Sequence, residues 1–374
     1  MPQVSPPPSG TGIVGTGFMG TVHARAVRAS GGEVVGVVGS TPERGATAAA
    51  ALGTAAYADV EALLADPAVT VVHVCTPNDL HPTITRAALA AGKHVVCEKP
   101  LATTLADAAA MEAEAAAAGV VATVPFVYRF HPMVREARAR VAAGALGRVI
   151  LAHGGYFQDW MAHPGADSWR VDPDRGGATR AFGDVGSHWC DLLEFVTGAR
   201  ITALSARLVT AIADRDSGPV TTDDIATLSF EATGGVVGTA VVSQVSPGRK
   251  NRLALEVSGL DGSIAFDQEE PERLWVGGLE ANQILLRDPT TASPAAAPYS
   301  SLPAGHPQGY QDCFTHFVAD TAAAIAGADV DGLPTFADGR RAAALAEAVV
   351  ASAASGGWVS VADVEAAAPV GAQS

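Results

Sequence analysis

Two residues of one short stretch, GDVGSHWCD, could exchange a proton with an alcohol. Asp184 and His188 are four positions apart, so they share a face if the segment is helical. An imidazole titrates near neutral pH and suits proton transfer, and a nearby carboxylate would orient it. Taken alone, however, an Asp and a His at this spacing are more often structural than catalytic.

A lysine with possible chemistry follows an expected strand at residues 94–97. In Glu98-Lys99-Pro100, the ammonium group could polarise a substrate oxygen or pass a proton. From the residues alone, a surface lysine in a turn without a chemical role is as well supported as a reactive one.

A glycine-rich turn precedes both stretches and matches the pattern GxGxxG. It follows an expected strand at 11–15 and opens an expected helix at 18–29, as in a dinucleotide-binding turn. The first glycine permits the tight turn, the second lets a pyrophosphate approach, and the third allows close helix packing. We therefore expect the turn to bind a nicotinamide dinucleotide through Gly15, Thr16, Gly17, Phe18, Met19 and Gly20.

The end of the second expected strand, 34–38, lacks the acidic residue that usually binds a ribose 2′-hydroxyl. Ser40 and Thr41 offer hydroxyls there, and Arg44 can reach a 2′-phosphate, so NADP is favoured over NAD. Alternatively, Ser40 or Thr41 only caps a helix and Arg44 is solvated. An Asp in place of Gly39 is expected to shift the preference toward NAD.

The loop after the third buried strand, 69–75, is the next candidate part of the cofactor site. Residues just past the carboxyl ends of strands line the ligand crevice of an open α/β sheet. The candidates are Thr76, Pro77, Asn78 and His81. The alternative is a plain loop in which Asn78 caps a helix.

The wider pattern divides the chain into two parts. Before residue 127, apolar strands alternate with helical segments at 18–29, 42–52, 60–65, 80–91 and 105–118, which predicts a parallel, doubly wound sheet. Later, strand-like runs without intervening helices predict a mostly antiparallel sheet. These runs are 149–156, 202–209, 224–231, 236–243, 253–258 and 263–267.

The remaining segments complete the expected organisation. Helices are predicted at 132–143, 187–197, 310–326 and 339–354, and residues 277–306 are expected to form a long surface excursion. The predicted parts are a disordered arm at 1–10, a cofactor domain at 11–126 and a substrate and oligomerisation domain at 127–374. The C-terminal helices of 310–354 are expected to pack back onto the first domain.

Composition excludes several classes of function. The net charge of −15 over 374 residues disfavours nucleic acid and anionic membranes as partners. The N-terminus shows no signal peptide and no apolar stretch is long enough for a membrane span, so we expect a cytoplasmic protein. The four cysteines form no CxxC pair, and neither a disulfide framework nor a metal site is expected.

The motifs GTGFMG, TPNDLH, CEKPLA and GDVGSHWCDL, in this order and spacing, resemble the Gfo/Idh/MocA oxidoreductases. The resemblance covers residues 11 to about 361. It implies a Rossmann domain followed by an open sheet flanked by helices, with the substrate crevice between the domains. It also implies reversible hydride transfer between NAD(P) and a cyclic sugar or polyol, and a homodimer or homotetramer that uses the open face of the second sheet.

The resemblance also implies roles for individual residues. Lys99 would lie by the reacting oxygen, His188 would be the general base or acid, and Asp184 would position the substrate or tune that exchange. Glu98 would help hold the cofactor, and the Lys99–Pro100 peptide is often cis in this family.

Further residues resemble a subgroup that acts on sugars and anhydrosugars. The segment from Tyr128 to Pro132 matches one that commonly follows the Rossmann domain in this family. Val127, however, stands where many relatives carry Asn. Tryptophan stacks on sugar rings, and Arg and Asp bind hydroxyls, although these tryptophans could equally be packing residues. The candidate substrate residues are Tyr128, Gln158, Asp159, Trp160, Trp169, Arg170 and Arg180, together with Asp184 and His188. His306 could also face the substrate, or an interface instead.

Two alternatives to a conventional dehydrogenase stay open. Non-catalytic, nicotinamide-dependent regulators share this fold, but such relatives tend to lose the lysine or the histidine, and Lys99 and His188 are both present. An oxidoreductase with a tightly held cofactor would differ only in not releasing it.

Overall fold

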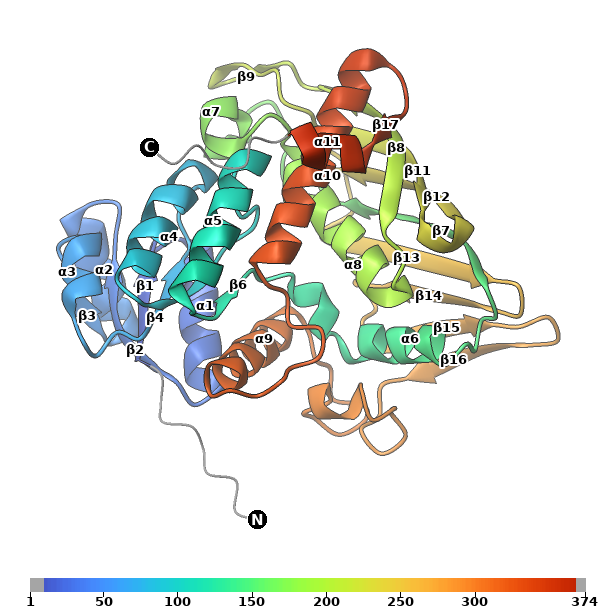
Figure 1. The fold of residues 1–374 in the computed structure, drawn as a ribbon, viewed down its shortest axis with the longest axis horizontal. Helices are drawn as coiled ribbons and strands as arrows, with labels where there is room; N and C mark the ends of the chain where they lie inside the picture. Colours follow the sequence, from blue (N-terminus) through green and yellow to red (C-terminus); the bar gives the residue numbers. More distant parts are fainter. Residues whose placement is uncertain (1–9, 368–374) are drawn as a thin grey trace. The chain divides into compact units, whose positions relative to one another are not determined.

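The computed structural model describes residues 10–367, which form two compact units that we treat separately (Figure 1). Within the described residues, unit 1 comprises 10–127 and Tyr310–Arg340, and unit 2 comprises Tyr128–Gly309 and 341–367. The expected disordered arm lies outside the described residues, except for Gly10, which is the first residue of a strand. None of the helices within residues 10–367 has both the length and the apolar character of a membrane span.

Unit 1 contains the predicted doubly wound parallel sheet. Its six strands have the order β3-β2-β1-β4-β5-β6, and all neighbours are parallel. The order reverses between β1 and β4, and ligands of such sheets bind at this reversal. The strands are β1 (Gly10–Val14), β2 (Glu33–Val38), β3 (Ala55–Ala56), β4 (Val71–Val74), β5 (His94–Cys97) and β6 (Ala122–Thr123).

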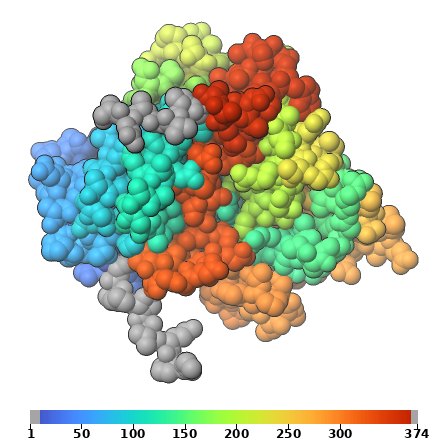
Figure 2. Space-filling view, viewed as in Figure 1, coloured from blue at the N-terminus to red at the C-terminus, as the bar shows by residue number. Residues whose placement is uncertain are grey.

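Helices cover the sheet of unit 1 because its central strands are apolar on both faces; Ile13, Val72 and Val95 are completely buried. In the space-filling view, the cyan and teal surface of α4 and α5 hides the strands beneath (Figure 2). The helices are α1 (Phe18–Ala29), α2 (Pro42–Leu52), α3 (Val60–Ala65), α4 (His81–Ala90), α5 (Leu105–Ala118) and α9 (Tyr310–Ile325), the last packed on α1.

Unit 2 is built on a nine-stranded sheet of order β16-β15-β14-β13-β7-β12-β11-β8-β17. Only β7 and β12 are parallel neighbours, so the predicted mostly antiparallel sheet is confirmed. The strands are β7 (Val149–Phe157), β8 (Ile201–Val209), β11 (Ile225–Ala232), β12 (Val236–Ser243), β13 (Arg252–Gly259), β14 (Ser263–Asp267), β15 (Arg273–Gly277), β16 (Asn282–Leu286) and β17 (Val359–Ser360). A separate ribbon pairs β9 (Asp214–Arg215) with β10 (Gly218–Pro219).

The two faces of this sheet differ. α6 (Pro132–Ala142) and α8 (Ser187–Thr197) pack on one face. Burial alternates along β11 and β12, as expected of strands with one covered face. The opposite face leaves apolar side chains exposed, among them Leu151, Val237 and Val241.

The expected surface excursion at 277–306 is only partly correct. Residues 282–286 form β16, which pairs with β15 in a hairpin at the sheet edge. Four of its five side chains are exposed, so it lacks the buried alternation by which a strand is recognised. The last helices are α10 (Phe336–Ser355), whose residues from 341 onward belong to unit 2, and α11 (Val361–Ala367).

Candidate active site

The glycine turn of unit 1 has the backbone geometry that its sequence predicts. Gly15 has a φ of 103°, and a Cβ there would lie 2.4 Å from the carbonyl oxygen of Cys75. A Cβ on Gly20 would lie 2.1 Å from the carbonyl oxygen of Gly15, whereas one on Gly17 would meet nothing within 4 Å. Gly15 and Gly20 are therefore required by the fold, and Gly17 leaves open space where a pyrophosphate can approach.

The start of α1 suits an anion. Its N-cap is Gly17, without a side-chain cap, and its first turn contains no acidic residue. Phe18 is 73% exposed, Thr16 and Met19 are half-buried, and the sulfur of Met19 lies 3.9 Å from the Tyr310 hydroxyl. The six residues of the turn thus fit the phosphate end of a dinucleotide.

The end of β2 carries the three side chains expected near the ribose. Thr41 caps α2 by accepting the Arg44 backbone N–H at 3.3 Å, and Arg44 Nη1 donates to Ser40 Oγ at 3.3 Å. All three residues are exposed. A Cβ on Gly39 would lie 2.3 Å from the Gly45 nitrogen, so no side chain fits there and placing Asp at Gly39 is the wrong test of cofactor preference.

The loop after β4 mixes open and buried groups. Asn78 is 7% exposed, Pro77 is half-buried, and Thr76 Oγ1 is a buried hydroxyl without a partner among the described residues. His81 is completely buried, with Nδ1 2.9 Å from the Pro100 carbonyl and Nε2 3.0 Å from that of Thr76. Burial lowers the pKa of His81 despite these carbonyls. Its ring connects the turns that follow β4 and β5. We therefore expect His81 to support the residues that hold the cofactor and not to contact the cofactor itself.

The turn after β5 holds Glu98 and Lys99, and the Lys99–Pro100 peptide is cis. Glu98 is 6% exposed; one oxygen lies 2.8 Å from His23 Nε2, and the other accepts the Lys99 backbone N–H at 3.1 Å. Burial alone would raise the pKa of Glu98, but His23 and the Lys99 charge lower it by more. Glu98 therefore presents a carboxylate that fixes the backbone beside Lys99.

Unit 2 places the predicted acid–base pair at the start of a helix. Asp184 lies in a π-helical turn, Phe182–Gly186, that leads directly into α8, and His188 is in the first turn of α8. Asp184 Oδ2 accepts the side-chain N–H of Gln244 at 2.7 Å and lies 3.7 Å from Arg170 Nε. The segment is helical throughout, as the four-residue spacing requires.

A closed ring of hydrogen bonds lies against His188. The His188 ring meets Tyr128 edge to face, with centroids 4.9 Å apart. Asn251 donates from Nδ2 to the Tyr128 hydroxyl at 3.2 Å and accepts at Oδ1 from Tyr156 at 2.6 Å. The two tyrosine hydroxyls also bond to each other. Because Tyr156 gives its proton to Asn251, Tyr128 must donate to Tyr156, so the two tyrosine protons are committed within the ring.

The expected sugar-binding loop is connected to this ring. Gln158 Nε2 donates to Asn251 Oδ1 at 2.8 Å, and Trp160 Nε1 donates to Gln158 Oε1 at 2.8 Å. Trp160 is 39% exposed, which leaves part of its ring available for stacking. Arg170 lies over the Trp169 ring at 4.5 Å.

Asp159 and His306 have surroundings that differ from this loop. Asp159 accepts from Lys250 at 2.6 Å and from the Gly248 N–H at 3.1 Å, and the Lys250 bond lowers the pKa of its carboxyl. These bonds anchor the loop. His306 is exposed, and its backbone carbonyl accepts from Arg287 at 2.7 Å.

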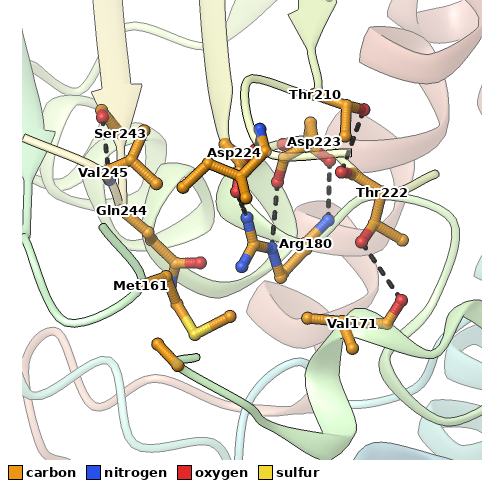
Figure 3. Close-up of polar contacts among 12 residues, drawn as sticks. Met161, Val171, Arg180, Thr210, Thr222, Asp223, Asp224, Ser243, Gln244 and Val245 are labelled. Atoms are coloured by element: carbon orange, nitrogen blue, oxygen red, sulfur yellow. Dashed lines mark hydrogen bonds and ion pairs between the residues drawn. The ribbon is translucent and has the colours of Figure 1, made fainter. Parts of the chain in front are cut away.

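Arg180 is a buried structural residue, and its expected role in binding a sugar hydroxyl is wrong. Figure 3 shows its side chain between Asp223 and Asp224, with Nε donating to the Asp223 carbonyl at 3.1 Å and the guanidinium paired with Asp224. Asp223 also accepts the backbone N–H groups of Arg180 and Phe182. The buried charges therefore hold the start of the turn that carries Asp184.

Arg215 extends the same buried cluster toward the loop. It pairs with Asp224 at 2.8 Å and donates to the carbonyls of Met161, His163 and Ala166, each at 3.1 Å. The stretch from 161 to 166 is thereby tied to the sheet.

No group of His, Cys, Asp and Glu side chains within residues 10–367 is arranged to hold a metal ion.

Sequence reasoning missed Tyr156, Gln244, Asn251, His23 and His73. Tyr156 and His73 lie within strands, where the sequence indicates burial but no partner. Asn251 and Gln244 lie in the loop between β12 and β13, where no motif or spacing in the sequence indicates a site.

Comparisons with known proteins cover both units. The model of the oxidoreductase family with an NAD-binding Rossmann fold, GFO_IDH_MocA, matches residues 10–126, and the GFO/IDH/MocA C-terminal domain matches residues 134–265. Levoglucosan dehydrogenase of Pseudarthrobacter phenanthrenivorans is 33% identical over 389 residues, covering 95% of this chain and 98% of that protein.

Two solved structures have the same fold over nearly their whole length. An oxidoreductase domain protein from Kribbella flavida is 38% identical with a TM-score of 0.87, covering 95% of this chain and 99% of that one. A levoglucosan dehydrogenase in complex with NADH and levoglucosan is 32% identical with a TM-score of 0.89, covering 95% and 100%. With matches to both domain models and across almost the entire chain, this protein belongs to the Gfo/Idh/MocA family of oxidoreductases.

Proposed function

We propose that this protein is a dehydrogenase that transfers a hydride between NAD(P) and a secondary hydroxyl of a cyclic sugar, anhydrosugar or polyol. The observation that carries the proposal is that both chemical motifs are intact. In unit 1, Lys99 lies in a turn whose backbone the Glu98 carboxylate holds. In unit 2, His188 and Asp184 lie on the same helical segment. A regulator on this fold would have no need of both groups.

Oxidation of an alcohol releases a hydride from carbon and a proton from oxygen. Bound NAD(P) supplies the hydride acceptor, so the protein must take the proton. We assign that step to His188, whose imidazole would accept the hydroxyl proton as the carbonyl forms. Lys99 would stabilise the negative charge that develops on the same oxygen. In the reduction direction His188 would instead donate the proton to that oxygen, while Lys99 would stabilise the same developing charge.

A neutral carbohydrate suits the groups around His188. Trp160 offers a partly exposed ring for stacking, while Gln158, Asn251 and Asp184 offer polar groups for hydroxyls. The similarity to levoglucosan dehydrogenases supports an anhydrosugar as the first compound to test.

For the cofactor we propose NADP ahead of NAD. The end of β2 carries no acid, Gly39 has no room for one, and Arg44 is exposed beside Ser40. Arg44 would pair with the 2′-phosphate, and the two hydroxyl side chains would bind its oxygens.

A panel of monosaccharides, anhydrosugars and inositols tests the proposed function, with NAD and with NADP, followed at the absorbance of reduced nicotinamide. At least one member is expected to support sustained turnover. Cofactor binding without turnover on any member, in either direction, would favour the non-catalytic regulator.

We further propose that a second copy of the chain covers the open face of the sheet in unit 2. Leu151 and Val237 lie side by side on β7 and β12, and Val241 continues the apolar row. Light scattering is expected to show a dimer or tetramer that Val241→Asp dissociates. A monomeric unmodified protein would refute this assembly.

A further inference from the structure

Unit 1 contains a line of three buried titratable side chains that the proposed mechanism does not use. His73 on β4, His23 on α1 and Glu98 after β5 are 2%, 0% and 6% exposed. His73 Nδ1 lies 2.9 Å from His23 Nδ1, and His23 Nε2 lies 2.8 Å from Glu98 Oε1. Fifty positions separate the two histidines in sequence.

The positions of the protons along this line are constrained. A carboxylate only accepts, so His23 Nε2 must carry the proton it shares with Glu98. One proton must also lie between the two Nδ1 atoms, because two lone pairs at 2.9 Å would repel. Burial, and to a smaller extent the electrostatic interaction with His23, lowers the pKa of His73 well below its usual value. His73 is therefore neutral, and its Nδ1 can donate to His23 or accept from it.

The line ends at the turn that carries Lys99. The Glu98 oxygen that does not face His23 accepts the backbone N–H of Lys99 at 3.1 Å. His23 also packs edge to face on Phe314 of α9, with centroids 5.1 Å apart, which holds its ring from the other side. Strand β4, helix α1 and the turn of Lys99 thus share one chain of hydrogen bonds, which α9 supports through a ring contact.

We propose that His73 and His23 are positioning residues that hold Glu98, and through Glu98 the backbone of Lys99, in the reactive arrangement. This inference rests on the proposed function, because it assigns Lys99 a role in the reaction. The imidazole pair keeps the carboxylate directed at the Lys99 N–H, and a network with all members satisfied is rigid. Its loss should reduce turnover and leave the cofactor turn of Gly15–Gly20 in place.

The test compares His73→Leu with His73→Asn. Asparagine places an amide group near the Nδ1 position and can either donate to His23 or accept from it. His94→Leu is the matched control, since His94 lies on the neighbouring strand β5 and bonds the Val121 N–H instead. We expect His73→Leu to lower kcat by about tenfold, with dinucleotide affinity changed by less than about threefold and His73→Asn restoring most of kcat.

Two results would overturn the role. One is a kcat of His73→Leu within about twofold of the unmodified enzyme. The other is equal loss in His73→Leu, His73→Asn and His94→Leu that follows their melting temperatures, as expected of mere packing.

A spectroscopic arm needs no turnover and separates this inference from the proposed function. With 15N-labelled histidine, the His23 Nε2 proton should resonate far downfield, as expected for a short bond to a buried carboxylate. Glu98→Gln should move it upfield, and His73→Leu should shift it as well. Absence of a downfield imidazole proton that responds to Glu98→Gln would refute the line. Failure of the sugar panel alone would leave it standing.

Discussion

Gln244 donates its side-chain N–H to Asp184 Oδ2 across 2.7 Å, although 60 positions separate the two residues. Gln244 is completely buried, and its backbone is held by the Asp224 carbonyl and the Met161 N–H. The amide is therefore fixed before substrate binds, and it sets the direction in which the Asp184 carboxylate faces.

Replacing Gln244 should disturb that carboxylate. We expect Gln244→Leu to lower kcat/KM by about ten- to a hundredfold, since a bond to a charged group contributes about 1.5–3 kcal/mol. Gln244→Glu should be worse, because two carboxylates would repel. Gln283→Leu on exposed β16 serves as the control. Equal activity of Gln244→Leu and the control would show that Asp184 needs no partner.

The ring around Asn251 gives a second prediction. Asn251→Leu leaves the Tyr156 hydroxyl and the Gln158 amide without their acceptor, so kcat/KM should fall by about tenfold or more. Asn251→Asp keeps that acceptor and replaces only the donor to Tyr128 with a second acceptor, so kcat/KM should fall less. Steady-state kinetics with the best substrate of the panel measure both. The reverse ranking would contradict the proton order in the ring.

A third prediction concerns stability in acid. Burial lowers the pKa of His131 to about 4, and its ring contacts those of Tyr128 and Phe266. An unfolded imidazole titrates near about 6.5, so the unfolded state binds more protons between these values and stability falls as the pH drops through them. The full contribution is roughly 3 kcal/mol.

His131→Phe should reduce this loss of stability. Urea unfolding at pH 7 and pH 4.5 measures it, with the exposed His306→Phe as the control. If His131→Phe and the unmodified protein lose the same stability over this interval, His131 is not the group that is protonated on unfolding.

The cofactor preference gives a fourth prediction. Arg44→Ala should weaken NADP binding by about tenfold and leave NAD binding nearly unchanged. Ser40→Asp should weaken NADP further by charge repulsion; Ser40 is exposed, whereas Gly39 has no room for a side chain. Calorimetry of both cofactors checks this. NAD binding as tight as NADP binding in the unmodified protein would reject the assignment.

The features that could be predicted from the sequence are those with local causes. Gly15, Gly17 and Gly20 follow from the backbone of one turn, and the parallel sheet follows from buried strands that alternate with helices. Contacts between distant segments could not be predicted this way. The sequence gives no sign that Asn251 meets Tyr128, or that His23 meets His73.

Arg180 illustrates a different limit. An arginine near tryptophans suggests hydroxyl binding, but its charge is matched by Asp223 and Asp224, more than forty positions later. Whether an arginine faces a ligand or a buried acid depends on tertiary packing that composition does not contain. Likewise, β16 has mostly exposed side chains and no periodic pattern.

The central claim is that His188 exchanges the proton and Lys99 stabilises the charge in a hydride transfer. The most direct test is kcat of purified, folded His188→Ala on the best substrate of the panel, with NADP affinity measured on the same preparation. We expect kcat to fall by on the order of 10²-fold or more, with little change in affinity, and Lys99→Ala to fall comparably. Turnover of His188→Ala near that of the unmodified enzyme would show that another group is the base and would contradict this account.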